Sequence, residues 1–122
     1  MILGTAQVGM NYGLTNLKGK INNENLGNII KFCSKNKILE LDTAFGYGDA
    51  HHRLANVLNK YCKKIDILWT ASCWDAPSVK FIEKYKVKFH KVPSACITDI
   101  SLLKELKKSK KPIIISTGMS TE

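Results

Sequence analysis

The sequence predicts an α/β fold, a partial (β/α) TIM-type barrel with about five parallel strands and four helices. Apolar runs alternate with helical patterns along the whole chain, and polar residues stand at the carboxyl ends of several apolar runs. The chain has 122 residues, whereas a complete eight-stranded barrel typically needs about 250. An open, doubly wound sheet fits the same alternation, but the polar strand ends favour the barrel.

Five apolar runs have the composition of buried parallel strands. They are residues 2–6, 38–44, 65–72, 89–94 and 112–117. Short connections predict right-handed βαβ units in which each strand lies beside the next one along the chain. The first and fifth strands are then exposed edges, which can pair with another copy of the chain. We therefore expect a homodimer formed through sheet edges, with aggregation as the competing outcome.

Four helical patterns separate these runs. The first two place apolar residues at i, i+3, i+4 and i+7, beginning at Leu26 and at Leu54. The third pattern is shorter and follows Asp75, a candidate N-cap. The fourth follows Thr98 and Asp99, and either side chain is a candidate cap.

Charge, hydropathy and cysteine spacing indicate which partners and which cellular location to expect. The net charge is +9, but the lysines are scattered, and their densest run, residues 104–112, fits the exposed face and end of one helix. We therefore expect no nucleic-acid partner. No apolar run is long enough to span a membrane. The four cysteines are widely spaced and lack a CxxC pair, which indicates reduced thiols in a cytoplasmic protein.

Polar residues near the ends of the third, fourth and fifth strands form the first candidate site. They are Ser72, Lys91, Ser94 and Ser116. In a sequential barrel these strands are neighbours, so one ammonium and three hydroxyls can face one pocket and hold a phosphate or carboxylate, helped by the Gly118 amide. The alternative is that Lys91 extends to the rim while the serines cap helices.

The second strand carries two acids, Glu40 and Asp42, on one of its faces. An acid turned toward a barrel interior requires a partner. A role for Asp42 as a helix cap or in a structural ion pair explains its position as well as a catalytic role does. Glu40 is expected to pair with a lysine.

Histidines and tryptophans are expected to be structural. His51, His52 and His90 lack a repeated ligand spacing, so packing or surface roles are favoured and no metal site is predicted. Trp69 and Trp74 bracket the end of the third strand and are expected in the core.

The first sixty or so residues resemble the aldo-keto reductases. The resemblance lies in "LGTAQVGMNYGLTN" (3–16) and "ILELDTAFGYGDAHHRLANVL" (38–58). It implies NADPH as the cofactor and places Asp42 and Tyr47 in a catalytic tetrad, with Tyr47 as the proton donor to a carbonyl. Where that family has its Lys and His, this chain has "WTAS" and "PSAC". The resemblance therefore implies a reductase remnant.

Residues 63–122 are similar to sialic acid (N-acetylneuraminate) synthases. The similarity lies in "DAPSVKFIEKY" (75–85), "KFHKVPSA" (88–95) and "IIISTGM" (113–119). It implies condensation of phosphoenolpyruvate with an N-acetylated amino sugar, using a divalent metal. It also implies that Ser72, Lys91, Ser94 and Ser116 bind the phosphate of phosphoenolpyruvate. The metal-binding histidines and sugar-binding residues of that family correspond to later strands.

The two resemblances together predict a chimera in one partial barrel domain, residues 1–122. Residues 1–62 are its reductase-like βα units and residues 63–122 its synthase-like βα units. The first functional hypothesis is a synthase-like fragment, a carbon–carbon bond-forming transferase if active, that keeps at most a phosphate-binding half-site for a small anionic substrate. The alternatives are an NADPH-dependent oxidoreductase remnant and a non-catalytic βα scaffold. No cofactor is assigned to the chain itself.

Overall fold

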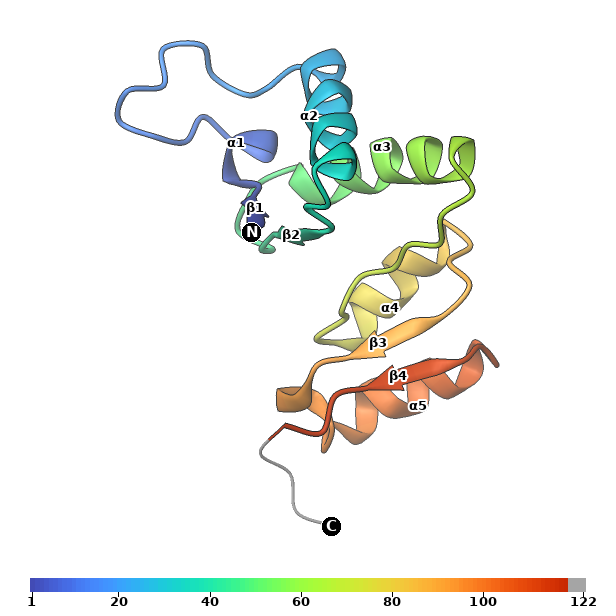
Figure 1. Cartoon of the computed structure of the whole chain (residues 1–122). Coiled ribbons are helices and arrows are strands. Elements are labelled where there is room, and N and C mark those ends of the chain that lie inside the picture. Colours follow the sequence, from blue (N-terminus) through green and yellow to red (C-terminus); the bar gives the residue numbers. More distant parts are fainter. Residues whose placement is uncertain (119–122) are drawn as a thin grey trace. The chain divides into compact units, whose positions relative to one another are not determined.

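The chain divides into two compact units in the computed structural model, which describes residues 1–118 (Figure 1). The first unit is Met1–Asp66 and the second begins at Ile67. Each unit has one pair of parallel strands and its own apolar core. The fold is therefore mixed α/β, built from short parallel strand pairs.

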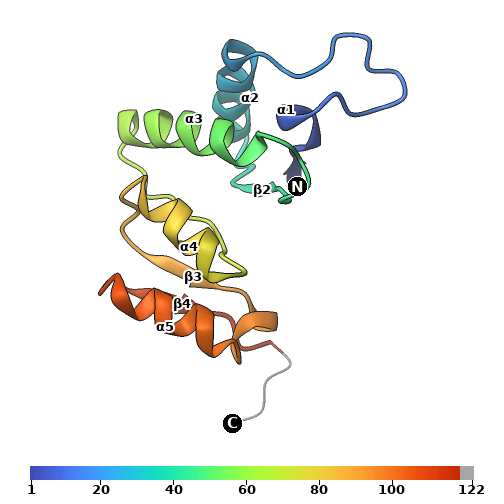
Figure 2. The same cartoon turned by 180° about the vertical axis from the view of Figure 1, so that it is seen from behind.

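The first unit consists of two strands and three helices. In chain order they are β1 (Ile2–Gly4), α1 (Ala6–Gly9), α2 (Asn23–Lys35), β2 (Glu40–Asp42) and α3 (Ala50–Lys64). β1 pairs in parallel with β2, with Leu3 opposite Leu41. A long connection joins α1 to α2, and α2 and α3 run across one another (Figure 2).

The core of the first unit comes mainly from its helices. Leu26 and Ile30 of α2 pack with Leu54 of α3, and Val8 of α1 completes the cluster. These positions follow the i, i+4 spacing that the apolar stripe predicts. The Asn22 side chain starts α2 by accepting a hydrogen bond from the Asn25 amide at 2.7 Å.

The second unit alternates helices and strands. In chain order they are α4 (Ala76–Glu83), β3 (His90–Val92), a 3-10 turn η1 (Ser94–Cys96), α5 (Ile100–Lys108) and β4 (Ile113–Ile115). β3 and β4 lie side by side in parallel, with Lys91 opposite Ile114 (Figure 1).

Both helices of the second unit begin at a capping aspartate. The Asp75 carboxylate accepts a hydrogen bond from the Ser78 amide at 2.7 Å, which confirms the predicted cap. Of the two candidates before α5, Asp99 is the cap, because its carboxylate accepts from the Leu102 amide at 3.0 Å. These caps fix the residue at which each helix starts.

The core of the second unit lies between its helices and one face of β3. Val79 and Ile82 of α4, Val92 of β3, and Leu102 and Leu106 of α5 are all buried. Apolar burial of this kind is the main favourable contribution to folding. The β3 strand is thus anchored by its core-facing side chains.

The prediction of five strands is wrong within residues 1–118, where the structure has four in two pairs. The run 65–72 contributes a single parallel bridge, between Ser72 and Lys91, and a hydrogen bond of 2.9 Å from the Thr70 hydroxyl to the Phe89 carbonyl. Ile67 and Leu68 stay exposed, so no core contact holds the start of this run in a strand. The short α1 was not predicted either, because four residues are too few for a periodic pattern.

A closed barrel is absent from the described part of the chain, residues 1–118. No helix there is long and apolar enough to cross a membrane. The predicted α/β class is confirmed, and consecutive parallel strands pair inside each unit.

Candidate functional site

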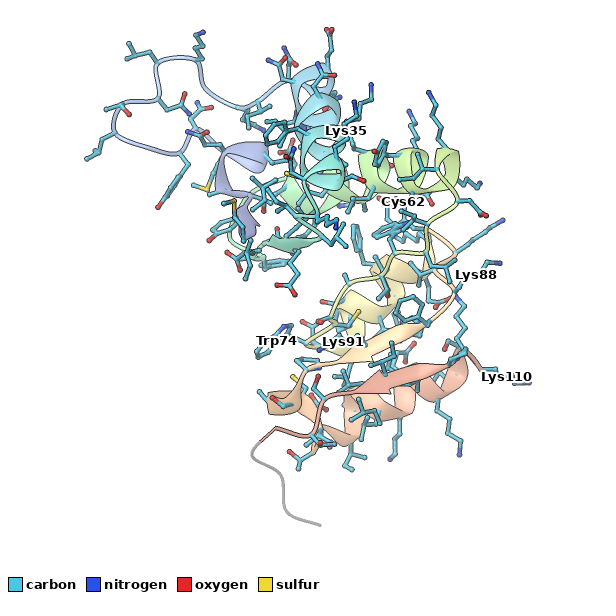
Figure 3. All side chains as sticks on the ribbon, viewed as in Figure 1. Lys35, Cys62, Trp74, Lys88, Lys91 and Lys110 are labelled. Atoms are coloured by element: carbon cyan, nitrogen blue, oxygen red, sulfur yellow. The ribbon has the colours of Figure 1, made fainter. Side chains whose placement is uncertain are left out.

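Lys91 lies in the middle of β3 and projects from the face opposite the helices. Its neighbours His90 and Val92 are completely buried, whereas Lys91 is only partly buried. Because side chains alternate along a strand, burial of His90 and Val92 against α4 and α5 turns Lys91 to the other face. Figure 3 labels this side chain on β3.

Ser72 and Ile114 flank Lys91 on that face. Ser72 forms the parallel bridge with Lys91 on one side, and Ile114 is opposite Lys91 in the β3–β4 register on the other. Directly paired residues project to the same side of a sheet. The structure therefore brings Ser72 and Lys91 together, as the sequential strand order predicts.

Ser94 and Ser116 stand just beyond the carboxyl ends of β3 and β4. The Ser116 amide donates a hydrogen bond of 3.1 Å to the Val92 carbonyl, which continues the ladder past β4. A Cβ atom placed on Gly118 would lie 3.8 Å from the Ser94 hydroxyl oxygen. The turn after β3 and the segment after β4 therefore adjoin at this end of the sheet.

The charge of Lys91 is not compensated within residues 1–118. No carboxylate there forms an ion pair with its ammonium, and no described acceptor takes a hydrogen bond from it. A cation flanked by hydroxyl groups at strand ends has the chemistry needed to hold a phosphate or carboxylate.

Asp42 and Tyr47 are not joined in a comparable way. Asp42 ends β2 and is exposed, and its backbone carbonyl accepts a hydrogen bond of 2.8 Å from the Thr5 hydroxyl. Tyr47 packs against the core of the first unit. Within the described chain the Asp42 carboxylate and the Tyr47 hydroxyl share no hydrogen bond. Glu40 is exposed as well, so neither acid of β2 is buried.

The turn that carries Tyr47 is shaped by two glycines. A Cβ atom on Gly9 would lie 1.7 Å from the Tyr47 carbonyl oxygen, and one on Gly48 would lie 2.5 Å from the Gly9 carbonyl oxygen. Gly48 also has a positive φ of 56°, which disfavours other residues. The end of α1 and the turn before α3 can approach this closely only because both residues lack a side chain.

Comparison with known protein families gives a match that includes the whole second unit. The sequence model of the NeuB family matches residues 49–122, more than half of the chain. The chain belongs to the NeuB family. The match begins at Asp49, directly before α3, and includes every residue of the candidate phosphate site.

Several curated relatives of the chain are named as synthases. The chain is 36% identical over 64 residues to an N-acetylneuraminate-9-phosphate synthase of Drosophila melanogaster, covering 52% of this chain and 17% of that protein. It is 37% identical over 60 residues to an N,N'-diacetyllegionaminic acid synthase of Campylobacter jejuni, covering 49% of this chain and 18% of that protein. A human N-acetylneuraminate-9-phosphate synthase is 33% identical over 64 residues, covering 52% of this chain and 18% of that protein. The chain thus matches less than a fifth of the length of these relatives, and the predicted synthase resemblance is confirmed.

A solved structure resembles the fold. A Pseudomonas aeruginosa protein assigned as an aldo-keto reductase superposes with a TM-score of 0.53 at 17% identity, covering 94% of this chain and 54% of that one. This likeness shows the fold alone. The reductase resemblance of the first sixty residues and the boundary between residues 62 and 63 stay predictions.

Sequence reasoning missed a charged cluster in the NeuB-family segment, on the helix-covered side of β3. Glu83 of α4 accepts two hydrogen bonds of 2.7 Å from the Lys111 ammonium, and its Oε1 lies 2.7 Å from His90 Nε2. The His90 contact is close but is not an aligned hydrogen bond, because neither ring nitrogen meets the directional criterion for one. No motif links the three residues, which lie on three different segments.

The electrostatics of Glu83 follow from this cluster. Burial raises the pKa of the Glu83 carboxyl, but the hydrogen bonds and charge of Lys111, followed by the nearby His90 ring, outweigh burial and leave the pKa below its ordinary value. His90 itself is completely buried. His90 therefore has the packing role expected of it, and the cluster ties α4 to the segment that leads into β4.

Arg53 was missed too. From α3, its guanidinium donates hydrogen bonds to the carbonyls of Val8 and Ile21 and to the Asn23 side chain. These bonds connect the two ends of the long segment between α1 and α2 to α3. The partners are up to 45 residues away, so no local sequence signal indicates them.

The two tryptophans differ in their burial. Trp69 packs against the core and lies 6.0 Å from the Tyr85 ring, as expected. The expectation for Trp74 is wrong, because it is 62% exposed and extends away from the ribbon (Figure 3). It stands in the loop before α4, where no helix face covers it.

All four cysteines are free and buried. Burial raises the pKa of the Cys73 thiol to about 11, and the charges of Asp75 and Glu83 add to the effect. A thiol with this pKa stays protonated at neutral pH and is a poor nucleophile or metal ligand. Cys73 is therefore a core residue.

The donor set of residues 1–118 does not fit the divalent metal that the synthase resemblance implies. No group of three or more His, Cys, Asp or Glu side chains in this part of the chain could hold a metal ion. No step is therefore assigned to a metal bound by these residues.

Proposed function

We propose that this NeuB-family chain is a sialic acid synthase-like fragment that retains a phosphate-binding half-site. The observation that carries the proposal is Lys91, a cation that no described carboxylate neutralises and that forms a parallel bridge with Ser72 on the sheet face that the helices leave open. The synthase names of the matched relatives support it.

The ligand proposed for this half-site is phosphoenolpyruvate. A phosphate ester carries roughly −1.5 to −2 charges at neutral pH and has several acceptor oxygens. Lys91 supplies an opposite charge, and the hydroxyls of Ser72, Ser94 and Ser116 supply hydrogen bonds. The role of the chain is to bind and orient the phosphate. Condensation with a sugar is a property proposed for a complete enzyme of the family.

Isothermal titration calorimetry with phosphoenolpyruvate tests the proposal. The full chain should bind the ligand, and Lys91→Ala should weaken binding by at least about tenfold, since removal of one partner from a close charge pair costs that much or more. Lys104→Ala is the matched control, because it removes the same charge from an exposed position on α5. Circular dichroism verifies that both variants are folded.

Two results would contradict the half-site. The first is equal weakening by Lys91→Ala and Lys104→Ala, which would mean that only net charge attracts the ligand. The second is absence of binding to a folded chain, which would leave a non-catalytic βα scaffold. The NADPH-dependent alternative gains no support from Asp42 and Tyr47, which share no hydrogen bond in the described chain.

We also propose a homodimer formed through exposed sheet edges. The support is β4, which pairs only with β3 among the described strands and exposes all three of its isoleucines. A strand edge of this kind pairs readily with another chain. Light scattering coupled to size-exclusion chromatography should give twice the monomer mass for the wild-type chain. The Ile114→Lys variant should give the mass of a monomer. A stable wild-type monomer would contradict the dimer.

The proposed location is the cytoplasm. All four cysteines are free, which suits a reducing compartment. Fractionation of cells that express the chain should place it with cytoplasmic markers, and recovery in an oxidising compartment would contradict this.

A further inference from the structure

A groove of about 640 Å³ lies between α2 and α3 in the first unit. Its polar lining consists of Asn23, Lys31, Arg53, Asn56, Lys60 and Lys64. The α3 members recur at helical spacing along one stripe, so the groove follows the two helices rather than a chance gap between loops. Its volume is in the range of small-molecule sites.

The charge in this groove is of one sign. Among the described residues, four cations line it and no carboxylate does. Lys31, Lys60 and Lys64 form no ion pair within the described residues. Within the described part of the chain Arg53 donates to carbonyl and amide oxygens and to no carboxylate, so no described group neutralises its charge either.

The groove between α4 and α5 shows that such charge imbalance is not a general property of helix pairs in this chain. That hollow, of about 310 Å³, is lined by Lys80 and Lys108 together with Glu83 and Glu105. Lys108 and Glu105 form an ion pair of 2.6 Å. In the second unit carboxylates thus stand among the interhelical lysines, whereas none of the described residues that line the groove of the first unit is a carboxylate.

Gly27 lines the same groove from the interior of α2. Glycine is less favourable than alanine inside a helix, so its presence calls for a reason. Packing does not supply one, since a Cβ atom there would meet no heavy atom within 4 Å. The consequence of Gly27 is an open groove floor between the cations of the two helices.

We propose that the α2–α3 groove binds a small molecule with multiply charged phosphate groups. Lysines and an arginine attract such a group, and the side-chain amides of Asn23 and Asn56 add hydrogen-bond donors. The aromatic ring of Tyr61 lies in the same lining and offers an apolar surface to the rest of the ligand. This site involves no residue of the half-site around Lys91 and does not depend on it.

The test is calorimetric titration with inorganic triphosphate. All measurements use the full chain in a Lys91→Ala background, so that the proposed half-site in the second unit cannot contribute. Gly27→Glu places a carboxylate in the groove at a position with open space. We expect it to raise the dissociation constant at least about tenfold, because like charges in one site cost that much or more.

Asn28→Glu is the matched control. It makes the same change in net charge on the adjacent exposed position of α2, which does not line the groove. Gly27→Gln adds similar volume without charge and should weaken binding less than Gly27→Glu does. Circular dichroism confirms that α2 is retained in each variant.

Three outcomes would overturn the site. One is absence of binding to the folded Lys91→Ala chain, and another is equal weakening by Gly27→Glu and Asn28→Glu, which would indicate net charge alone. The third concerns a single-stranded oligonucleotide. If it binds more tightly as its length increases and Gly27→Glu has no effect, the basic surface serves nucleic acid rather than a small phosphorylated molecule.

Discussion

The two units build the same βα pattern with different cores. In residues 1–66 the helices supply most of the core, and the end residues of β1 and β2 are exposed. In the second unit β3 is itself part of the core, with both end residues buried and only Lys91 turned outward. Lys91 thus stands between two buried residues of its strand, whereas Asp42 stands at the exposed end of a strand that only Leu41 joins to the core.

The two units also differ in the family match and in the candidate site that each contains. The NeuB match covers the second unit entirely and reaches only α3 of the first. The candidate half-site lies where β3 is anchored by core contacts, whereas the cationic groove of the first unit lies between two helices. In the second unit the candidate polar groups thus lie on a strand that packs into the core, and in the first unit they lie on the two helices that form the core.

The sharpest test of this comparison removes one core leucine from each unit. Leu106→Ala and Leu26→Ala, both at fully buried sites, should each lower the free energy of unfolding by about 3 kcal/mol through loss of apolar contact and a residual cavity. Both tryptophans lie in the second unit, so urea unfolding followed by tryptophan fluorescence reports that unit. Leu106→Ala should shift this transition and Leu26→Ala should not. An equal shift by Leu26→Ala would show that the cores unfold as one.

The next test concerns the close approach of two turns in the first unit. Gly9→Ala forces a Cβ atom against the Tyr47 carbonyl and the Ala50 amide, and it should cost about 2 kcal/mol, as overpacking at a buried site does. Gly27→Ala is the control, because open space there should allow a gain of about 0.5–1 kcal/mol from helix propensity. Urea unfolding followed by far-UV circular dichroism measures both. A neutral Gly9→Ala would refute the requirement for glycine.

A smaller loss is expected from Arg53→Met. The substitution keeps much of the side-chain volume but leaves the carbonyls of Val8 and Ile21 without this donor, which should cost about 1–2 kcal/mol. Lys60→Met removes the same charge from α3 without removing a described hydrogen bond. The same dichroism assay should separate the two variants, and identical stabilities would show that Arg53 acts through charge alone.

The smallest effect is a pH dependence confined to the second unit. The folded pKa of Glu83 lies below its ordinary value of 4.5, so the folded state binds fewer protons than the unfolded state in this window. Its stabilising effect is present above the ordinary value and is lost as pH falls through the folded pKa. Fluorescence-detected unfolding should show this loss in the wild type and a flatter profile in Glu83→Gln. Parallel profiles would exclude Glu83 as the source.

Local features of the chain could be predicted because they depend on nearby residues. The apolar stripe from Leu26 and the caps at Asp75 and Asp99 follow from spacing within one or two turns. The adjacency of Ser72 and Lys91 follows from sequential strand order. The third strand was overpredicted, since an apolar run becomes a strand only where a neighbour and a core accept it.

The sequence by itself therefore determined the four longer helices, the cap of α4, the α/β class and the NeuB-family character of the second half. Only the tertiary structure decided which face of β3 is buried, and so why His90 turns to Glu83 while Lys91 turns outward. It also decided that the interhelical lysines of one unit meet carboxylates and those of the other do not. The physical reason is that helix periodicity and capping are local, whereas burial and charge pairing depend on segments that meet only in the folded chain.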